Sequence, residues 1–199
     1  MARFASALDA AGLNLRAALP IDTYDAAVPG PWRSAALRPD ARRAIVVASG
    51  GRALWDALTR APELGAVADP LDAYTRRVTA AAASELEPGA AVLYAHERRG
   101  GLYADFVELG RLAGLGAPSR LHLLLHPIYG PWMSLRAVVL TSLEGQTGAP
   151  LAFDPCRDCP APCTAAASHE RARRACLVGP DHRYGEAALA HLRHHAGLS

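Results

Sequence analysis

The chain has 199 residues, a length that suits one domain of ordinary size or one domain with a small appendage. Hydrophobic residues make up 51% of it but aromatic residues only 6%, so a core must pack mainly Leu, Val and Ala. The formal net charge of +2 is close to neutral, so we expect no binding to nucleic acid. No apolar stretch approaches the roughly 20 residues that span a bilayer, so we expect a cytoplasmic protein that does not bind membrane.

The first part of the chain predicts a helix, a proline-rich segment and a strand that leads into a helix. Residues 3–12 have the pattern of a short amphipathic helix, and the prolines that follow, between 20 and 39, favour ordered loops. The β-branched run over 44–48 predicts a buried strand, and a helix is expected over 52–60. The connection Ser49-Gly50-Gly51 is either a simple turn or a phosphate-binding one, because a helix N-terminus attracts anions.

The next part predicts helices over 69–86 and 103–112 and a strand over 91–95. Two further strands are expected over 121–126 and 135–141, and their connection is too short for a crossover helix, so we expect a hairpin. A last helix is expected over 184–195. This order predicts an α/β fold with a mixed sheet and flanking helices, followed by a small cysteine-rich C-terminal segment.

A change of composition at Thr147-Gly148-Ala149-Pro150 marks the expected domain boundary. We expect a cofactor-binding α/β domain over 1–150 and a metal-binding tail over 151–199. The tail holds all four cysteines, which are Cys156, Cys159, Cys163 and Cys176. In a reducing cytoplasm, clustered cysteines bind metal more often than they form disulfides.

The cysteine spacing indicates a metal site without fixing the metal. Cys156 and Cys159 are separated by two residues, which lets two thiolates reach one metal or cluster, whereas Cys163 comes one residue later than in the usual ferredoxin spacing. A [4Fe–4S] cluster, a structural zinc held by four thiolates, and redox-active cysteines without metal all stay open. Coordination by four thiolates alone does not separate iron from zinc.

A series of motifs precedes the cysteines. Ala113-Gly114-Leu115-Gly116 is followed by His126-Pro127, by Gly130-Pro131-Trp132 and by Arg136-Ala137-Val138-Val139-Leu140. This series resembles the cobalamin-binding domain of epoxyqueuosine reductases and the related core of corrinoid-dependent reductive dehalogenases, and its second part also resembles the cblC-type cobalamin-processing proteins. The resemblance covers residues 105 to 165. It implies a flavin-reductase-like α/β core that binds cobalamin, or alternatively flavin.

The resemblance also implies candidate site residues. The expected cofactor contacts are His126, Tyr129, Trp132 and Arg136, and the candidate catalytic acid is Asp105. Four of the five have a structural alternative: His126 could bond the backbone at a strand end, Trp132 could anchor the core, Arg136 could pair with a carboxylate, and Asp105 could favour a helix N-terminus electrostatically.

Two features depart from the epoxyqueuosine reductases. The position of their proton-donating aspartate falls near Gly100, and Asp105 is close but out of register. Those enzymes carry eight cysteines for two clusters, whereas the four cysteines here suffice for one.

We therefore predict a cobalamin-binding iron–sulfur redox protein that delivers electrons from a single cluster to a corrinoid or flavin, with an electron-donor protein as a partner. The alternatives are a non-catalytic corrinoid carrier and a protein-interaction module with a structural zinc. Whether the chain is itself an oxidoreductase stays open.

Overall fold

A computed structural model describes residues 1–34, 37–97 and 104–195. Its main sheet consists of β1 (Leu15–Pro20), β2 (Arg43–Gly50), β3 (Ala91–Tyr94) and β6 (Met133–Thr141). The strands are antiparallel and lie in the order β1-β2-β6-β3. β2 is buried along its whole length, in keeping with its central position and its β-branched sequence.

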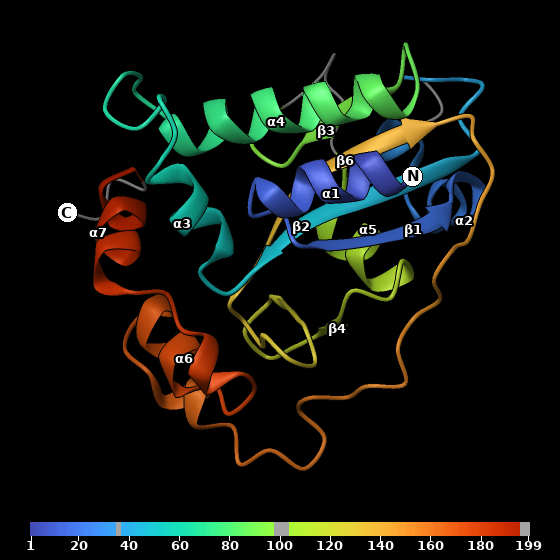
Figure 1. Ribbon diagram of the computed structural model, residues 1–199. Helices are drawn as coiled ribbons and strands as arrows, with labels where there is room; N and C mark the ends of the chain where they lie inside the picture. The colour runs from blue at the N-terminus through green and yellow to red at the C-terminus, as the bar shows by residue number, and fades with distance from the viewer. Residues whose placement is uncertain (35–36, 98–103, 196–199) are drawn as a thin grey trace.

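Helices cover both faces of the sheet, so the fold has three layers (Figure 1). One face carries α1 (Ala2–Ala10), α3 (Ala53–Leu58) and α4 (Pro70–Leu86). The other carries α2 (Ile21–Ala27) and α5 (Phe106–Leu112). Side chains alternate along a strand, so Ile45 packs with the first group of helices and Val46 with the second. The predicted α/β class with flanking helices is confirmed, but where a mixed sheet was expected, the strand pairs of the described residues are all antiparallel.

Most predicted elements are confirmed, with ends displaced by a few residues. The helices expected over 3–12, 52–60 and 69–86 are α1, α3 and α4, and the strands over 44–48 and 91–95 are β2 and β3. The helix expected over 103–112 is α5, whose predicted start at Tyr103 lies outside the described residues.

Between α1 and β2, three elements stand where only loops were expected. β1 is an edge strand without a β-branched residue, and most of its side chains are only half-buried, so its sequence gives little strand signal. α2 follows directly and buries Ile21 and Tyr24, three residues apart, on the sheet. A short 3-10 helix, η1 (Gly30–Trp32), completes this segment.

The predicted hairpin of strands 121–126 and 135–141 is wrong. β6 pairs with β2 and β3, whereas β5 (Leu124–Leu125) pairs with β4 (Ala117–Pro118) in a separate two-stranded sheet. A tight turn separates them, closed by hydrogen bonds from the His126 amide to the Gly130 carbonyl (3.1 Å) and from the Gly130 amide to the His126 carbonyl (2.7 Å). Leu121 and Leu125 pack against the C-terminal segment instead of the main sheet.

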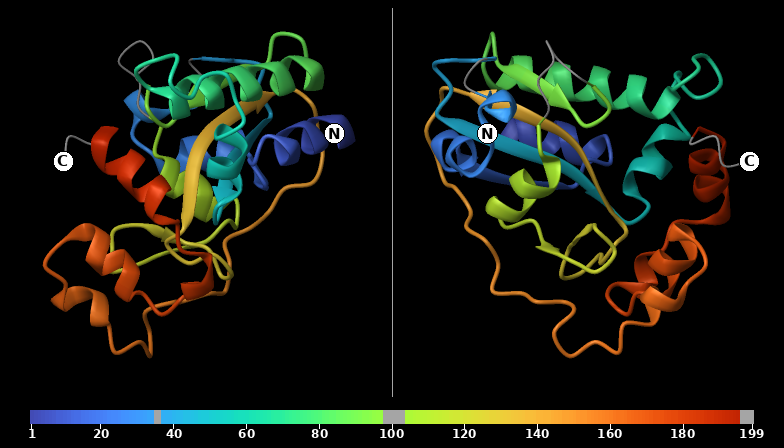
Figure 2. Two further views of the ribbon diagram at one scale, coloured as in Figure 1. Left: turned by 60° about the vertical axis from the view of Figure 1, so that its left-hand side comes forward. Right: turned by 180° about the vertical axis from the view of Figure 1, so that it is seen from behind.

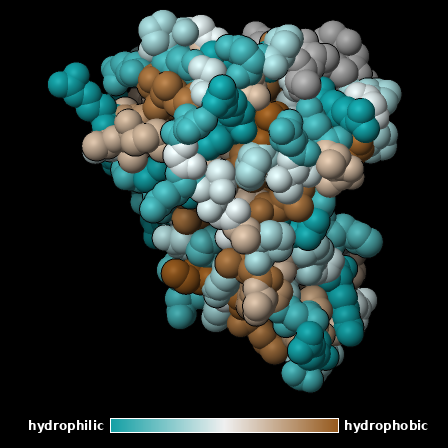
Figure 3. All heavy atoms as spheres, turned by 90° about the vertical axis from the view of Figure 1, so that its right-hand side faces the viewer, coloured by the Kyte–Doolittle hydropathy of each residue, from teal (hydrophilic) through white to brown (hydrophobic). Residues whose placement is uncertain are grey.

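After β6 the chain returns along the outside of the molecule as an extended strap, which we define as residues 142–160 (Figure 1). The Gly148 amide donates to the Ala18 carbonyl of β1 at 2.6 Å, and a Cβ at Gly148 would lie 2.2 Å from the Ala113 carbonyl oxygen, so only glycine fits this close approach. Leu143 and Leu151 of the strap stay exposed. Figure 3 looks onto this side, where apolar and hydrophilic side chains are interspersed.

The strap leads to a group of short helices that lies against one end of the core (Figure 2). They are η3 (Pro162–Ala165), α6 (His169–Ala175), η4 (Pro180–His182) and α7 (Glu186–His195). α7 corresponds to the predicted terminal helix. Ala188 and Leu189 are buried, so α7 docks on the core by an apolar face.

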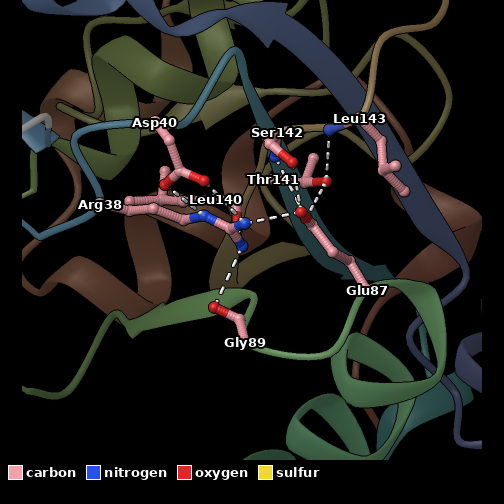
Figure 4. Close-up of polar contacts among 8 residues, drawn as sticks. All are labelled: Arg38, Asp40, Glu87, Gly89, Leu140, Thr141, Ser142 and Leu143. Carbon is pink, nitrogen blue, oxygen red and sulfur yellow. Dashed lines mark hydrogen bonds and ion pairs between the residues drawn. The ribbon is translucent and has the colours of Figure 1, made fainter.

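A polar cluster around Glu87 fastens the opposite end of the sheet (Figure 4). The Glu87 carboxylate accepts hydrogen bonds from the Thr141 hydroxyl (2.6 Å), the Ser142 amide (3.1 Å) and the Arg38 guanidinium (2.6 Å). Burial alone would raise the pKa of Glu87, but the bonds from Ser142, Thr141 and Arg38 outweigh it and lower the pKa to about 2. The cluster thereby joins the end of α4, the end of β6 and the loop before β2.

Replacing Glu87 by Gln should lower the free energy of unfolding by about 1.5–3 kcal/mol near neutral pH, the range for hydrogen bonds to charged groups. The folded pKa of about 2 lies below the ordinary value of 4.5, so the stability that Glu87 contributes is complete above 4.5 and is lost as the pH falls toward 2. Urea unfolding of wild type and E87Q across this pH range measures both effects. Glu85, exposed on the same helix, supplies the control E85Q, and equal losses in E85Q and E87Q would contradict this role.

Candidate functional site

The four cysteines line a single small pocket, which we call the thiol pocket. Cys156, Cys159, Cys163 and Cys176 share it with Leu121 and Leu125 of the core and with Val178. All four are free thiols and half-buried. The contact with Leu121 and Leu125 sets Cys163 and Cys176 against the two-stranded sheet of β4 and β5.

Backbone N–H groups point at two of the four sulfurs. The Ala161 amide donates to the Cys159 sulfur at 3.4 Å, and Ala161 itself has a left-handed backbone (φ 53°). Burial raises the pKa of the Cys176 thiol, the Val178 amide lowers it, and the three other cysteines raise it further. On balance the pKa of Cys176 is raised, so metal binding there would have to displace a proton.

Four cysteines on one pocket supply the number and type of ligands that a four-thiolate group needs. The thiols are farther apart than metal ligands would be. Within residues 1–34, 37–97 and 104–195, no set of three or more His, Cys, Asp or Glu side chains lies closely enough together to hold a metal ion. A metal at the thiol pocket would have to draw the loop of Cys156 to Cys163 together around it. The predicted ligand set stays a prediction.

His126 stabilises the tight turn before β6. Its Nδ1 accepts hydrogen bonds from the Ile128 amide (3.0 Å) and the Tyr129 amide (3.3 Å), so the proton of the neutral ring is assigned to Nε2. Burial, and then the nearby His182, lower the pKa of His126. In this conformation neither ring nitrogen offers a free lone pair to a metal, and the side chain has the structural role of bonding the backbone.

Tyr129 lies on the glycine turn that follows β2. A Cβ at Gly50 would lie 2.4 Å from the Tyr129 ring, and one at Gly51 would lie 3.6 Å from it. Tyr129 also meets His182 edge-on, with ring centroids 4.6 Å apart. The Tyr129 ring thus occupies the space beside Ser49-Gly50-Gly51 that a phosphate would need, and the turn is a packing surface.

Trp132 is a core anchor with 1% of its surface exposed. The Arg173 guanidinium lies over its ring at 5.0 Å from the centroid, and the Tyr184 ring meets it edge-on at 5.3 Å. Arg173 also donates to the Pro131 carbonyl at 2.6 Å. Trp132 therefore holds the C-terminal segment on the core and presents no open face to a cofactor.

Arg136 and Asp105 lie in different parts of the molecule. Asp105 is the N-cap of α5, where its carboxylate accepts from the Glu108 amide at 2.9 Å. Its predicted role as an acid stays a prediction, and Gly100, the position that matches the aspartate of the reductases, lies outside the described residues. Arg136 is largely buried at the start of β6, with its Nη1 3.6 Å from an Asp72 carboxylate oxygen.

The structure thus separates the predicted cofactor contacts into two groups. His126 and Tyr129 lie on one side of the glycine turn, and Arg136 lines a second pocket with Gly51 and Tyr184. Sequence reasoning missed His182, which meets Tyr129, and it missed Tyr184 and Asp72, which lie near Arg136. Only the glycine turn gave a signal, because a pair of glycines permits the close approach of another ring.

No protein-family model matches the chain, and no curated protein does. Solved structures do match it. The Caenorhabditis elegans B12-trafficking protein CblC, a homologue of human MMACHC, matches with a TM-score of 0.54 and 15% identity over 86% of this chain and 82% of that chain. Epoxyqueuosine reductase from Streptococcus thermophilus matches with a TM-score of 0.53 and 14% identity over 80% of this chain and 50% of that chain.

This chain has the CblC fold. The fold that the sequence resemblance implied is confirmed, and the chain spans about half the length of the epoxyqueuosine reductase. A structure of epoxyqueuosine reductase with a tRNA stem loop matches with a TM-score of 0.49, 14% identity and coverage of 78% of this chain and 48% of that chain. The expectation that this chain binds no nucleic acid stays a prediction. Among the described residues, no helix combines the length and apolar composition needed to cross a bilayer.

Protonation of His126 should weaken the fold, because an imidazolium cannot accept the Ile128 and Tyr129 amides. Its folded pKa lies below the ordinary 6.5, so stability is retained above 6.5 and falls as the pH drops through the lower folded value. In H126N the amide oxygen can accept the same bonds, so this part of the pH dependence should disappear. Thermal unfolding of both proteins from neutral to mildly acidic pH tests this, with exposed His122→Asn as the control; an unchanged slope in H126N would refute the assignment.

Gly50→Ala should lower the free energy of unfolding by about 1–3 kcal/mol, because the added Cβ overlaps the Tyr129 ring. Gly30→Ala is the matched control, since nothing lies within 4 Å of its Cβ. Combining Gly50→Ala with Tyr129→Ala should restore part of the loss, which a double-mutant cycle in urea quantifies. Additive losses would show that Tyr129 does not occupy the turn.

Proposed function

We propose that this chain is a corrinoid-binding redox protein that holds one iron–sulfur cluster at Cys156, Cys159, Cys163 and Cys176. The observation that carries the proposal is the convergence of all four thiols on one pocket against the core of a chain with the CblC fold. Residues 151–199 are the metal-binding unit in this proposal, and residues 1–150 bind the cofactor.

The corrinoid part is supported by the fold. CblC is a B12-trafficking protein, and its fold covers most of this chain. Of the predicted contacts, Tyr129 lies beside Ile128, which is 60% exposed at the tip of the tight turn, so this turn presents apolar surface to a large ligand. Arg136 would approach an acidic or carbonyl group, and Trp132 would act by holding Tyr184 in place.

The cluster part is supported by the donor set. Four cysteines suffice for one four-thiolate group, and the Ala161 amide donates a hydrogen bond to the Cys159 sulfur. A bound cluster would supply single electrons at low potential, and a bound corrinoid would accept them at cobalt. The chain's own part is to hold both groups, shield them with Leu121 and Leu125, and supply the N–H donors that tune the sulfurs.

One observation favours the second candidate, a non-catalytic corrinoid carrier with a structural zinc. The Asp105 carboxylate, the predicted acid, accepts the Glu108 amide as a helix cap. A carrier needs no acid, whereas a reductase must protonate its product.

Purification without oxygen followed by visible spectroscopy and metal analysis separates the two candidates. The redox proposal expects about four iron atoms per chain and a broad visible band that dithionite bleaches. Addition of hydroxocobalamin should shift the corrin spectrum under both candidates. One zinc per chain with a corrin shift would select the carrier, and zinc with an unmoved corrin spectrum would reject both.

Cys156→Ser should abolish the visible band and the bound iron, because the remaining three thiols leave the cluster one ligand short. Asp158→Asn, an exposed change in the same loop, is the matched control and should keep both. Retention of full iron in C156S would contradict the ligand assignment. Circular dichroism of C156S establishes whether the core keeps its fold when the tail loses its metal.

A further inference from the structure

Two turns meet backbone to backbone beside the thiol pocket. One is the tight turn before β6, and the other, which we call the tail turn, is residues 176–179, directly after α6. A Cβ at Gly130 would lie 2.0 Å from the Val178 carbonyl oxygen, and a Cβ at Gly179 would lie 2.5 Å from the Tyr129 carbonyl carbon. Both glycines have a left-handed backbone, with φ of 55° and 65°. The contact therefore requires glycine on both sides, and neither turn has room to shift without the other.

The contact extends from the backbone of the tight turn to the side chain of Tyr129. The His182 amide donates to the Gly179 carbonyl at 3.1 Å, which ties His182 to the end of the tail turn. His182 meets the Tyr129 ring edge-on, and the same ring packs on the backbone of Gly50. Of these two contacts of the ring, the one with Gly50 belongs to the buried strand β2, and the one with His182 depends on the tail turn.

The tail turn starts at a candidate metal ligand. Cys176 ends α6, and Val178, whose carbonyl abuts Gly130, lines the thiol pocket together with it. α6 is held on the core three residues earlier, where the Arg173 guanidinium lies over the Trp132 ring at 5.0 Å from the centroid. Because α6 is already fixed there, a constraint placed on Cys176 is passed on to the tail turn.

A bound metal would supply such a constraint. The tail turn contacts the loop of residues 156–163 by apolar packing, in which Cys163 and Cys176 share one cluster with Leu125 of β5. A metal held by all four thiolates would add direct bonds between that loop and Cys176. The tail turn would then be constrained at both of its ends, by the metal at Cys176 and by the close contact at Gly179.

We infer that the thiol pocket and the tight turn are energetically coupled through the contact between Gly130 and Gly179. A metal bound through Cys176 orders the tail turn, and the close contact passes this order to Tyr129 and Ile128. The inference rests on the proposed function in taking Cys176 as a ligand, and it adds a regulation to that site. The surface that the tight turn offers to a corrinoid is fully ordered only when the thiol pocket is filled. Coupling between two sites is reciprocal, so a ligand on the tight turn also strengthens metal binding.

Cobalt(II), added without oxygen to the reduced, metal-free, full-length protein, tests the coupling. Its thiolate-to-metal absorption bands report binding at the cysteines, and hydrogen–deuterium exchange of peptides that cover the tight turn reports the order of the turn. The amides of Ile128, Tyr129 and Gly130 all donate hydrogen bonds within this turn, so their exchange measures its opening. We expect them to exchange at least about fivefold more slowly once cobalt is bound, the lower end of the usual range for coupled sites. Peptides around Glu87, at the opposite end of the sheet, should be unaffected.

Gly179→Ala should uncouple the two sites, because the added Cβ forces the turns apart. The variant should keep the cobalt–thiolate bands, since Gly179 supplies no ligand, but cobalt should no longer slow the exchange of the tight turn. Gly185→Ala, in the same tail with nothing within 4 Å of its Cβ, is the matched control and should behave as wild type. Gly89→Ala controls for backbone strain, because Gly89 also has a positive φ (86°) and nothing within 4 Å of its Cβ. If G179A does not fold, the comparison of wild type with and without cobalt still decides.

Cobalt–thiolate bands without slower exchange in the tight turn would overturn the inference and leave the ligand assignment standing. Equal slowing in G179A and wild type, or uniform slowing in all peptides, would also overturn it, because the effect would then not pass through the contact between the two glycines. Absence of the bands would reject the ligand set of the proposed function, and the coupling with it. The absorption spectrum therefore separates a failure of the coupling from a failure of the proposed function.

Discussion

The antiparallel pairing of β2 with β6 holds the other parts of the molecule in their places. The ladder runs from Arg43 opposite Thr141 to Gly50 opposite Met133, and it brings a buried strand from each half of the chain to the centre of the sheet. At one end, the Glu87 cluster fastens the outgoing strap. At the other end, the glycine turn after β2 and the first residues of β6 form the surface on which the C-terminal segment docks.

The chemistry gathers at this second end for a physical reason. A strand that is buried along its length has no room for polar groups until it reaches its end, so Ser49, Ser134 and Arg136 appear where β2 stops and β6 starts. Tyr129 packs on the bare backbone of the glycine turn and Trp132 on the C-terminal segment. Together they bring the cysteines and α7 to the same end of the sheet without any strand extending into the tail.

Local patterns in the sequence were sufficient for the central elements and insufficient for the edges. The β-branched run of β2 predicts a strand and the long apolar periodicity of α4 predicts a helix, because burial on the sheet requires those residues. β1, an edge strand of Leu, Arg, Ala and Pro, gains its conformation from pairing with β2, and no local preference reveals it. The prediction of a hairpin is wrong because the His126–Gly130 turn directs β6 to the main sheet, while Leu121 and Leu125 pack against the C-terminal segment.

The candidate site likewise has some features that the local sequence could predict and others that it could not. Clustered cysteines predicted one shared pocket, since their short spacing limits how far apart they can lie. The group of Asp72, His96 and Arg136 comes from α4, the end of β3 and β6, and only the three-layer packing brings these residues together. No spacing along the chain could indicate it. His126 is the reverse case. Its motif predicted a cofactor contact, but its side chain accepts hydrogen bonds from the backbone amides of its own turn.

The strap has a consequence for how the protein is made. All four strands of the main sheet lie before residue 142, so the nascent chain can complete this sheet before α7 has been synthesised and before the cysteines have left the ribosome. The thiol pocket closes only after the strap has carried the last segment back over the finished sheet. Under the proposed function, metal insertion would therefore be a late event in maturation, carried out on a core that is already folded.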